Sequence, residues 1–487
     1  MTHLTASPLG MILSTPATGK ELHAAAVIKE GNSNITYCPE LRVIDFARNK
    51  LIANIPVELG SLKRLVWLAV AVNQLTGGIP PSLGKCFFAP SHLQRLDYFG
   101  VVENIISGTF AYSLYNISTL RTIYAGANRL NGTLPANIGL TLPNLRILSI
   151  GINNFSGPIP VSLSNASRLQ LLHLVYNNFV GQVPTDLGNL PNLQILGVDG
   201  NNLGSNSAGD LDFLTSLANC TKLEKLGFSD SNFGGSLPDS IGNLSEQLSS
   251  LNIARNKISG VVPAALENLI NFNILVMQDN LFTGPIPVYF GKFQKLQGLA
   301  LDENRLSGDI PSSIGNLTQL VQLLLSKNKL EGSIPSSLGN CIRLQYLVIS
   351  ENNLSGAIPK TILSSQLLGL YLSHNSLTGI LPMEVGNLKS IVELNVSENH
   401  LFGEIPTTIG DCSSLQNLYL QGNSFEGNLP PSLASLKDLR YADLSRNNFS
   451  GLIPKDLQNI SVILYLNLSF NNLVGENCNC KYAMSKL

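Results

Sequence analysis

Acidic and aromatic side chains recur at fixed distances before an asparagine that repeats along this 487-residue chain. Counted from that residue, or from the serine that once replaces it, the candidate binding residues stand four, two or one positions earlier: Tyr124, His173, Tyr176, Asp199, Asp230, Arg255, Gln278, Asp279, Asp302 and Glu303. Five are acidic, whereas Arg255 is basic. Carboxylates attract a basic partner, and rigid tyrosines make good anchors for a peptide. The pattern predicts a site for a peptide of basic character, although exposed positions of this kind are also polar by default.

Catalytic, metal and nucleotide chemistry finds no support in the sequence. The six histidines lack the spacing of metal ligands, and the Gly-Lys pairs at 18–20, 83–85 and 291–295 lack the frame of a phosphate loop. Kinase catalytic motifs are absent too. The balance of 31 basic and 32 acidic residues gives no general attraction for nucleic acid. No apolar run reaches the roughly 18 residues that a membrane helix needs. We expect no catalysis, cofactor, metal, nucleic acid or membrane span within these residues.

Repeats of about 24 residues position the candidate side chains, as in LVQLLLSKNKLEGSIPSSLGNC (320–341). Alignment on the asparagine gives 18 repeats, of which 17 carry it, from Asn49 to Asn471, and one has Ser231. Alternating leucines such as Leu323 and Leu325 predict a short buried strand, and the asparagine is expected to turn inward and pair with backbone groups. The sequence therefore predicts a right-handed α/β solenoid superhelix, with parallel strands on its concave face and short 3-10 or irregular segments on its convex face.

Glycine and proline mark the other half of each repeat. Glycines at the LxG position (Gly308, Gly332 and Gly356 among them) predict a tight turn with positive φ, and a proline follows in 15 repeats. The long interval before Ser231 contains NSAGDLDFLTSLANC (206–220), which predicts a longer helical segment on the convex side. We expect an atypical N-terminal segment at 1–40, one continuous repeat domain at 41–476 and an atypical tail at 477–487.

The seven cysteines do not read as a disulfide framework. Cys86, Cys220, Cys341 and Cys412 occupy a repeat position where neighbouring repeats have leucine, which predicts small buried apolar residues. The nearest two lie three repeats apart, roughly 15 Å at the spacing of strands, beyond the reach of a disulfide. Cys478 and Cys480 are too close together for an easy bridge, and Cys38 has no evident partner.

Glycosylation sequons recur in the repeats and favour a secreted chain, although a repeat rich in NLS and NFS also generates them as a by-product. The candidate sites are Asn116, Asn131, Asn154, Asn165, Asn219, Asn243, Asn316, Asn353, Asn395, Asn448 and Asn459. Asn395 is expected to face the concave surface, where a glycan would obstruct a ligand. That expectation also favours ligand contact nearer the middle of the chain.

The LxGxIP half of the repeat resembles the plant-type leucine-rich repeats of receptor-like kinases over about 41–476. More narrowly, DLDFLTSLANCTKLEKL (210–226), SLPDSIGNLSEQLSSL (236–251) and LNLSFNNLVGE (466–476) are similar to the subfamily containing the receptor for bacterial elongation factor Tu and the rice bacterial-blight resistance receptor. The resemblance implies an ectodomain that recognises a peptide or microbial epitope in innate immunity or signalling. The paired cysteines and tryptophan of the family's N-terminal cap are not found in residues 1–40.

The resemblance also implies partners and a location. It predicts a peptide or protein ligand, a co-receptor kinase at the C-terminal repeats, and the extracellular face of the plasma membrane. A Ser/Thr kinase domain is expected in full-length relatives, so that this chain reads as a receptor truncated before its membrane helix and kinase. The alternative is a secreted repeat-type inhibitor or a decoy receptor-like protein that binds another protein.

Overall fold

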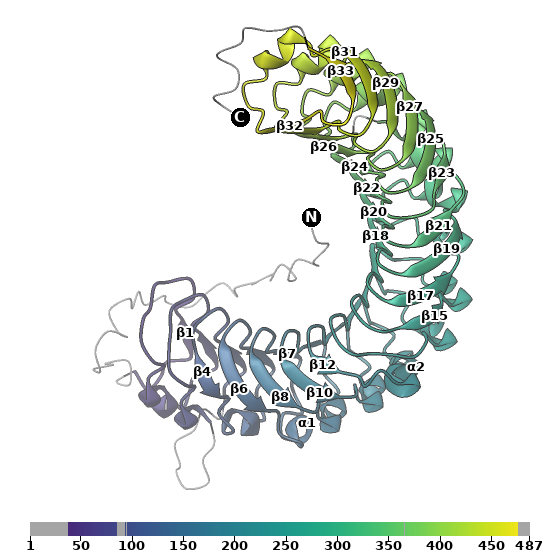
Figure 1. The fold of residues 1–487 in the computed structure, drawn as a ribbon. Helices are drawn as coiled ribbons and strands as arrows, with labels where there is room; N and C mark the ends of the chain where they lie inside the picture. The colour runs from purple at the N-terminus through teal and green to yellow at the C-terminus, as the bar shows by residue number, and fades with distance from the viewer. Residues whose placement is uncertain (1–37, 85–92, 94, 365, 476–487) are drawn as a thin grey trace. The chain divides into compact units, whose positions relative to one another are not determined.

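The computed structural model describes residues 38–84, 93, 95–364 and 366–475. These residues belong to two compact units, Met1–Leu248 and Ser249–Leu487, called unit 1 and unit 2 below. Within both units a coil consists of a short ladder strand, a turn, in most coils a second short strand, and a short helix that is usually 3-10 (Figure 1). The predicted leucine-rich-repeat solenoid is confirmed. Cys86, Cys478 and Cys480 lie outside the described residues, as does nearly all of the expected N-terminal segment.

The ladder strands of unit 1 pair in parallel, each with the strands of the coils before and after it. Their register is constant, so that Trp67 lies opposite Tyr98, and Tyr98 opposite Thr122. Equivalent side chains of successive repeats therefore stand in rows. In sheet order the strands are β1 (Val43–Asp45), β2 (Trp67–Ala69), β3 (Tyr98–Gly100), β5 (Thr122–Tyr124), β7 (Ile147–Ser149), β9 (Leu171–His173), β11 (Ile195–Gly197) and β13 (Lys225–Gly227).

Unit 2 repeats the same parallel arrangement. The central residue of each ladder strand points into the coil, and Leu323 and Leu325 are both 0% exposed, as the alternation predicts. In sheet order the strands are β14 (Ser250–Asn252), β16 (Ile274–Val276), β18 (Gly298–Ala300), β20 (Gln322–Leu324), β22 (Tyr346–Val348), β24 (Gly369–Tyr371), β26 (Glu393–Asn395), β28 (Asn417–Tyr419), β30 (Tyr441–Asp443) and β32 (Tyr465–Asn467).

The repeating asparagines bind successive coils together, as expected. The Asn399 Nδ2 donates to the carbonyl oxygens of Leu372 (3.0 Å), Val396 (3.1 Å) and Ser397 (3.0 Å). Its Oδ1 accepts the N–H of Leu377 at 3.0 Å. One side chain thus saturates backbone groups of its own coil and of the coil before it, at a point where only 5% of the asparagine is exposed.

A second set of short parallel strands, which the sequence analysis did not predict, follows the asparagine. In unit 1 these strands are β4 (Ser107–Thr109), β6 (Arg129–Thr133), β8 (Asn154–Gly157), β10 (Asn178–Gly181) and β12 (Asn202–Leu203). In unit 2 they are β15 (Ser259–Val261), β17 (Leu281–Gly284), β19 (Arg305–Asp309), β21 (Lys329–Glu331), β23 (Ser355–Gly356), β25 (Ser376–Ile380), β27 (His400–Gly403), β29 (Ser424–Asn428), β31 (Asn448–Leu452) and β33 (Asn472–Val474). The repeat glycines lie in or beside these strands with positive φ, as Gly308 (74°) and Gly332 (72°) illustrate.

Short helices close each coil on the side away from the ladder strands (Figure 1). Proline sets where most of them begin: Pro311, in extended conformation, accepts the N–H of Ile314 at 3.1 Å. Unit 1 has η2 (Val57–Ser61), η3 (Pro81–Leu83), η4 (Leu114–Asn116), α1 (Ile138–Thr141), η5 (Val161–Asn165), η6 (Thr185–Asn189), η7 (Ala208–Leu211), α2 (Asp212–Leu217) and η8 (Asp239–Asn243). Unit 2 has η9 (Ala264–Asn268), η10 (Val288–Lys292), η11 (Ser312–Asn316), η12 (Ser336–Asn340), η13 (Lys360–Ile362), η14 (Met383–Asn387), η15 (Thr407–Asp411), η16 (Pro431–Ser435) and η17 (Lys455–Asn459).

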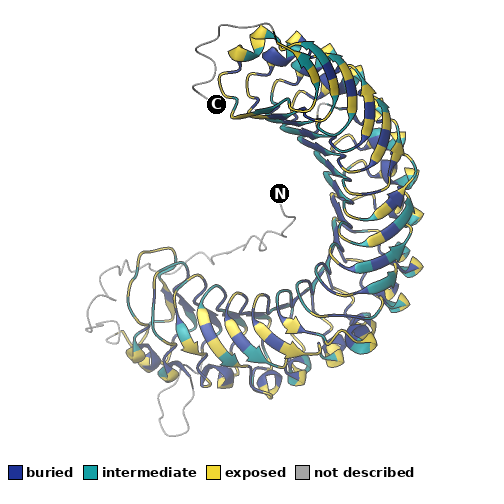
Figure 2. Cartoon of the chain, in the orientation of Figure 1, coloured by how far each residue is buried: buried dark blue, intermediate teal, exposed yellow. Residues whose placement is uncertain are grey.

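Two further predictions about the coils are confirmed. The helical segment expected within 206–220 forms η7 and α2, where Phe213 and Leu214 are buried. Cys220, Cys341 and Cys412 are free and buried, and each thiol donates to a carbonyl of the coil before it. Figure 2 shows how buried and exposed residues alternate along each coil. No helix of the described residues is long and apolar enough to cross a membrane.

Candidate ligand-binding face

Four positions of each ladder segment project from the coil, at six, four, two and one residues before the asparagine. We call the surface they form the ladder face and number its rows −6, −4, −2 and −1. The candidates lie in rows −4, −2 and −1, and the structure adds row −6. Candidates from His173 to Asp230 belong to unit 1, and those from Arg255 to Glu303 belong to unit 2, so each group is described within its own unit.

Row −1 has a backbone conformation that the sequence analysis missed. Its non-glycine residues adopt the left-handed region, as shown by Tyr176 (φ 49°), Arg255 (50°) and Glu303 (55°). This conformation is unfavourable for L-residues, by about 1 kcal/mol. Backbone bonds to the next coil offset that cost, since the N–H of Arg255 donates to the Gln278 carbonyl at 2.9 Å, and the Glu303 N–H to Ser326 at 2.8 Å. The side chains of row −1 therefore project from a backbone bend that these hydrogen bonds hold in place, and not from an extended strand.

The unit 1 candidates lie on neighbouring coils that are rich in glycine. His173 packs against Gly151 and Gly197, and the ring of Tyr176, 49% exposed, lies over Gly200. A Cβ built on Gly200 would come within 2.4 Å of that ring. Burial lowers the pKa of His173, so its imidazole is neutral near pH 7. Because these glycines have no side chains, the His173 and Tyr176 rings can occupy the space beside them.

Asp199 forms part of the structure as well as of the candidate site. Its Oδ1 accepts both the backbone N–H (3.0 Å) and the hydroxyl (2.7 Å) of Ser229 in the next coil. Burial raises the pKa of Asp199, the Ser229 hydrogen bonds oppose the rise, and the charge of Asp230 adds to it. Asp199 and Asp230 thus lie close enough, in neighbouring coils, for their like charges to repel each other.

Tyr124 belongs to an aromatic cluster of unit 1 that the sequence analysis recognised only in part. Trp67 and Tyr98 of row −6 stack with ring centroids 3.6 Å apart and an interplanar angle of 7°. The Tyr98 ring lies 5.9 Å from that of Tyr124. Trp67 and Tyr98 were missed because row −6 was left out of the candidate rows, although the repeat register places them beside Thr122.

In unit 2, Arg255, Gln278, Asp279, Asp302 and Glu303 occupy rows −2 and −1 of three consecutive coils. Asp279 and Glu303 are exposed, whereas the other three are partly buried. The structure adds Lys327, whose Nζ lies 2.8 Å from Glu303 Oε1. Lys327 belongs to the coil that follows the candidates, and its positive charge offsets part of the negative charge expected here.

Asp302 is the most strongly perturbed acid of this group. Burial raises its pKa to about 6, and the charges of Glu303 and Asp279 add to the rise, while its own backbone N–H and Lys327 oppose it. Its Oδ1 is buried and has no hydrogen-bond partner among the described residues. Because the charged form is poorly compensated, this carboxylate gains from a cationic or hydrogen-bond-donating ligand.

No group of three or more His, Cys, Asp or Glu among the described residues could hold a metal ion. The structure therefore offers rows of tyrosine, carboxylate and amide side chains on a hydrogen-bonded scaffold, a surface suited to binding an extended partner.

Ten of the eleven candidate glycosylation asparagines are exposed, on the short helices, after α2, or along the second strands. Asn395 differs, because it lies in ladder strand β26 and is only partly exposed. Its Oδ1 accepts the Ser397 N–H (3.1 Å) and hydroxyl (2.7 Å), and Ser397 is 2% exposed. Both polar residues of this sequon are thus engaged inside the ladder, which disfavours a glycan.

Leucine-rich-repeat family models match this chain. The model described as Leucine Rich Repeat matches at 222–244, 247–269, 295–317, 319–341, 414–436 and 438–460, and a second one described as Leucine rich repeat matches at 335–401. The plant peptide hormone receptor RGFR1, solved in complex with RGF2, superposes with a TM-score of 0.75 at 30% identity, over 91% of this chain and 76% of that one. The chain belongs to the leucine-rich-repeat family.

Its relatives are plant receptors. The LRR receptor-like serine/threonine-protein kinase EFR of Arabidopsis thaliana is 43% identical over 76 residues, 16% of this chain and 7% of the kinase. The receptor kinase-like protein Xa21 of Oryza sativa subsp. japonica is 43% identical over 68 residues, 14% of this chain and 7% of its own. The Arabidopsis receptor kinase HAESA, solved with the peptide hormone IDA and the co-receptor SERK1, has a TM-score of 0.68 at 30% identity, over 90% and 79% of the two chains. The matches to EFR and Xa21 thus each span only 7% of those kinases.

Proposed function

We propose that this leucine-rich-repeat chain is the ligand-recognition part of a plant receptor, acts at the extracellular face of the plasma membrane, and binds a peptide or microbial epitope on its ladder face. The observation that carries the proposal is the run of Asp279, Asp302 and Glu303 on a scaffold whose turns are fixed by asparagine. Solved neighbours of the same fold hold peptide hormones. The kinase that follows in relatives and a co-receptor at the C-terminal coils belong to the same proposal.

The chemistry of the face favours a basic ligand. A carboxylate with a buried, unpaired oxygen at Asp302 gains a partner when a donor arrives, and the charge of its neighbour Asp279 attracts cations from solution, whereas Glu303 already pairs with Lys327. Because the ladder is already hydrogen bonded, little conformational entropy is lost by the receptor on binding. A peptide with lysine or arginine residues is therefore the proposed ligand class.

A screen with displayed random 12-residue peptides tests the proposal. Peptides selected on the full chain should be basic, and their affinity should fall at least about tenfold, roughly 1.4 kcal/mol, in the double variant Asp279→Lys/Glu303→Lys. The matched control is Asp309→Lys/Glu331→Lys, which changes charge equally on exposed residues of β19 and β21 in the second set of strands. Equal binding by both double variants, with circular dichroism like that of the parent chain, would refute this placement of the site.

A further inference from the structure

A second group of polar and aromatic side chains stands on the ladder face of unit 2, around strands β26 to β32. Glu393, Asn417, Tyr441 and Tyr465 lie opposite one another in row −6, and Asn395, Tyr419, Asp443 and Asn467 do so in row −4. Tyr441 is 41% exposed and Tyr465 is 44% exposed. Three tyrosines and two carboxylates thus lie on four consecutive coils of this face.

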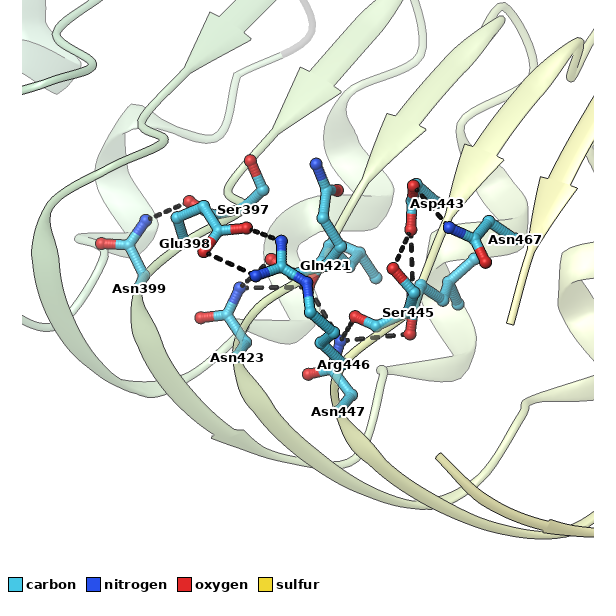
Figure 3. Close-up of polar contacts among 12 residues, drawn as sticks. Ser397, Glu398, Asn399, Gln421, Asn423, Asp443, Ser445, Arg446, Asn447 and Asn467 are labelled. Carbon is cyan, nitrogen blue, oxygen red and sulfur yellow. Dashed lines mark hydrogen bonds and ion pairs between the residues drawn. The ribbon is translucent and has the colours of Figure 1, made fainter. Parts of the chain in front are cut away.

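Asp443 is a fixed negative charge in this group. Its Oδ1 accepts the Ser445 hydroxyl (2.6 Å) and N–H (3.0 Å), and its Oδ2 accepts the Asn467 amide at 3.0 Å (Figure 3). The Tyr465 hydroxyl donates to the same Oδ2 at 3.2 Å. Burial works against ionisation, but these hydrogen bonds outweigh it and lower the pKa of Asp443. The carboxylate is thus charged near neutral pH, and its oxygens already have donors.

Glu393 keeps acceptor capacity that Asp443 lacks. Its Oε2 accepts the Asn417 amide at 3.0 Å, and it also interacts with the Tyr371 hydroxyl. A carboxylate has about four acceptor sites, so that Glu393 has room for a further donor. Among the described residues, neither Glu393 nor Asp443 forms an ion pair with a Lys, Arg or His side chain. Two negative charges therefore stand here without a counter-charge.

Tyr419 lies between the two carboxylates. On one side Tyr419, in β28, lies opposite Asp443 of β30. On the other side Glu393 of β26 lies opposite Asn417, which is two residues before Tyr419 in β28. From the spacing of strands and residues, the Cα atoms of Tyr419 and Glu393 are about 8 Å apart. Burial raises the pKa of Tyr419, and the charges of Glu393, Tyr441 and Asp443 add to it. The phenol thus stays neutral and offers an aromatic face inside a negative field.

We propose that Tyr419 and Glu393, assisted by the charge of Asp443, form a subsite for an arginine side chain of a bound peptide. The inference rests on the peptide-binding function proposed above and names one contact within it. A guanidinium stacks on the phenol ring by cation–π attraction and donates a charge-assisted hydrogen bond to Glu393. Arginine fits better than lysine, since its planar group stacks and donates at the same time.

The test combines substitutions in peptide and protein. Random 12-residue peptides displayed on phage are selected on the full chain, and selected sequences are synthesised with each arginine replaced in turn by citrulline, a neutral group of the same shape. We expect enrichment of arginine over lysine. At one position citrulline should weaken binding to the parent chain about fivefold or more. The loss should shrink to less than twofold in Tyr419→Ala and Glu393→Gln, and persist in Tyr419→Phe, which keeps the ring and the packing.

The outcomes separate the two proposals. If peptides bind but citrulline weakens binding equally in the parent chain and in Tyr419→Ala, the subsite is refuted while the peptide-binding function stands. Selection without arginine enrichment refutes the subsite in the same way. If no peptide binds the parent chain, the function and the subsite fail together. Because Tyr419→Phe and Glu393→Gln conserve shape, a folding defect in Tyr419→Ala leaves the comparison intact.

Discussion

Removal of the Asn399 side chain should loosen unit 2 by an amount that the hydrogen bonds allow us to estimate. Asn399→Ala deletes three donated bonds and the acceptor of the Leu377 N–H. Each of the three carbonyls keeps another donor: Leu372 receives Asn375, Val396 receives Asn423, and Ser397 receives the His374 N–H. The full penalty of about 1–3 kcal/mol for a buried unpaired group therefore applies mainly to the Leu377 N–H, and the three shared bonds contribute about 0.5 kcal/mol each. We expect a total loss of about 3 kcal/mol.

Asn399→Asp should be worse than Asn399→Ala near neutral pH. A carboxylate can still accept the Leu377 N–H but would face three carbonyl oxygens without a proton to donate. The folded-state pKa of the new carboxyl would therefore be raised. Its contribution to stability would be present below the unfolded value near 4 and lost as the pH rises through the folded value. The defect of Asn399→Asp should thus grow from pH 4 to pH 7, whereas that of Asn399→Ala should not.

Hydrogen exchange, measured by mass spectrometry on a peptide containing Leu377, reports the protection of the Leu377 amide. Urea unfolding followed by circular dichroism measures the loss of stability. The matched control is Asn340→Ala, an exposed asparagine at the end of η12, which should change stability by less than about 0.5 kcal/mol. An Asn399→Ala variant that loses less than about 1 kcal/mol and keeps the Leu377 amide as protected as in the parent chain would contradict the expected loss.

Four further outcomes are expected. Gly422→Val should cost more than about 1 kcal/mol in urea unfolding, because Gly422 has φ 67° and its added Cβ would meet a carboxylate at 2.6 Å. Arg446→Met removes an ion pair in which the arginine side chain is 54% exposed and the glutamate side chain 26% exposed; it should cost less than about 1 kcal/mol, and the opposite ranking would contradict this. Burial raises the pKa of Asp302 to about 6, so the contribution of this carboxyl to the free energy of unfolding should be fully present below pH 4 and lost as the pH rises through 6. The expected loss is on the order of 2 kcal/mol. Urea titrations at several pH values should show this dependence in the parent chain and not in Asp302→Asn. In glycopeptide mass spectrometry of the chain secreted from plant cells, exposed Asn353 should carry a glycan and Asn395 should not; occupancy of Asn395 would contradict this prediction.

Glycines in row −1 allow charged side chains of more distant coils to meet. The Arg446 guanidinium pairs with Glu398 two coils earlier (Figure 3). The Glu398 carboxylate lies over Gly422, the row −1 residue of the coil between them. A missing side chain thus lets two charges meet across an intervening repeat. In unit 1 the ring of Tyr176 similarly lies over Gly200, so row −1 glycines decide where their neighbours lie.

The repeat sequence predicted most of the coil because its signals are local. Alternating leucines give the strand, and the LxG glycine gives the positive φ that Gly332 adopts, whereas the place of proline at the start of the short helix comes from the structure. The second strand was missed because segments such as Lys329–Glu331 are three residues long and gain their stability from pairing with the preceding coil. No residue within a single repeat signals that pairing.

The sequence by itself determined the period, the rows and the types of side chain that occupy them, since a constant spacing forces equivalent residues into register. Only the tertiary structure decided which side chains meet. Lys327 neutralises Glu303, Ser229 holds Asp199, and Trp67 stacks on Tyr98 across distances of 24 to 31 residues in sequence. These contacts depend on rotamers and on the room that neighbouring coils leave, which no residue sets alone. The repeat sequence therefore sets which residues form the ladder face, and the stacking of the coils decides which of their charges come into contact.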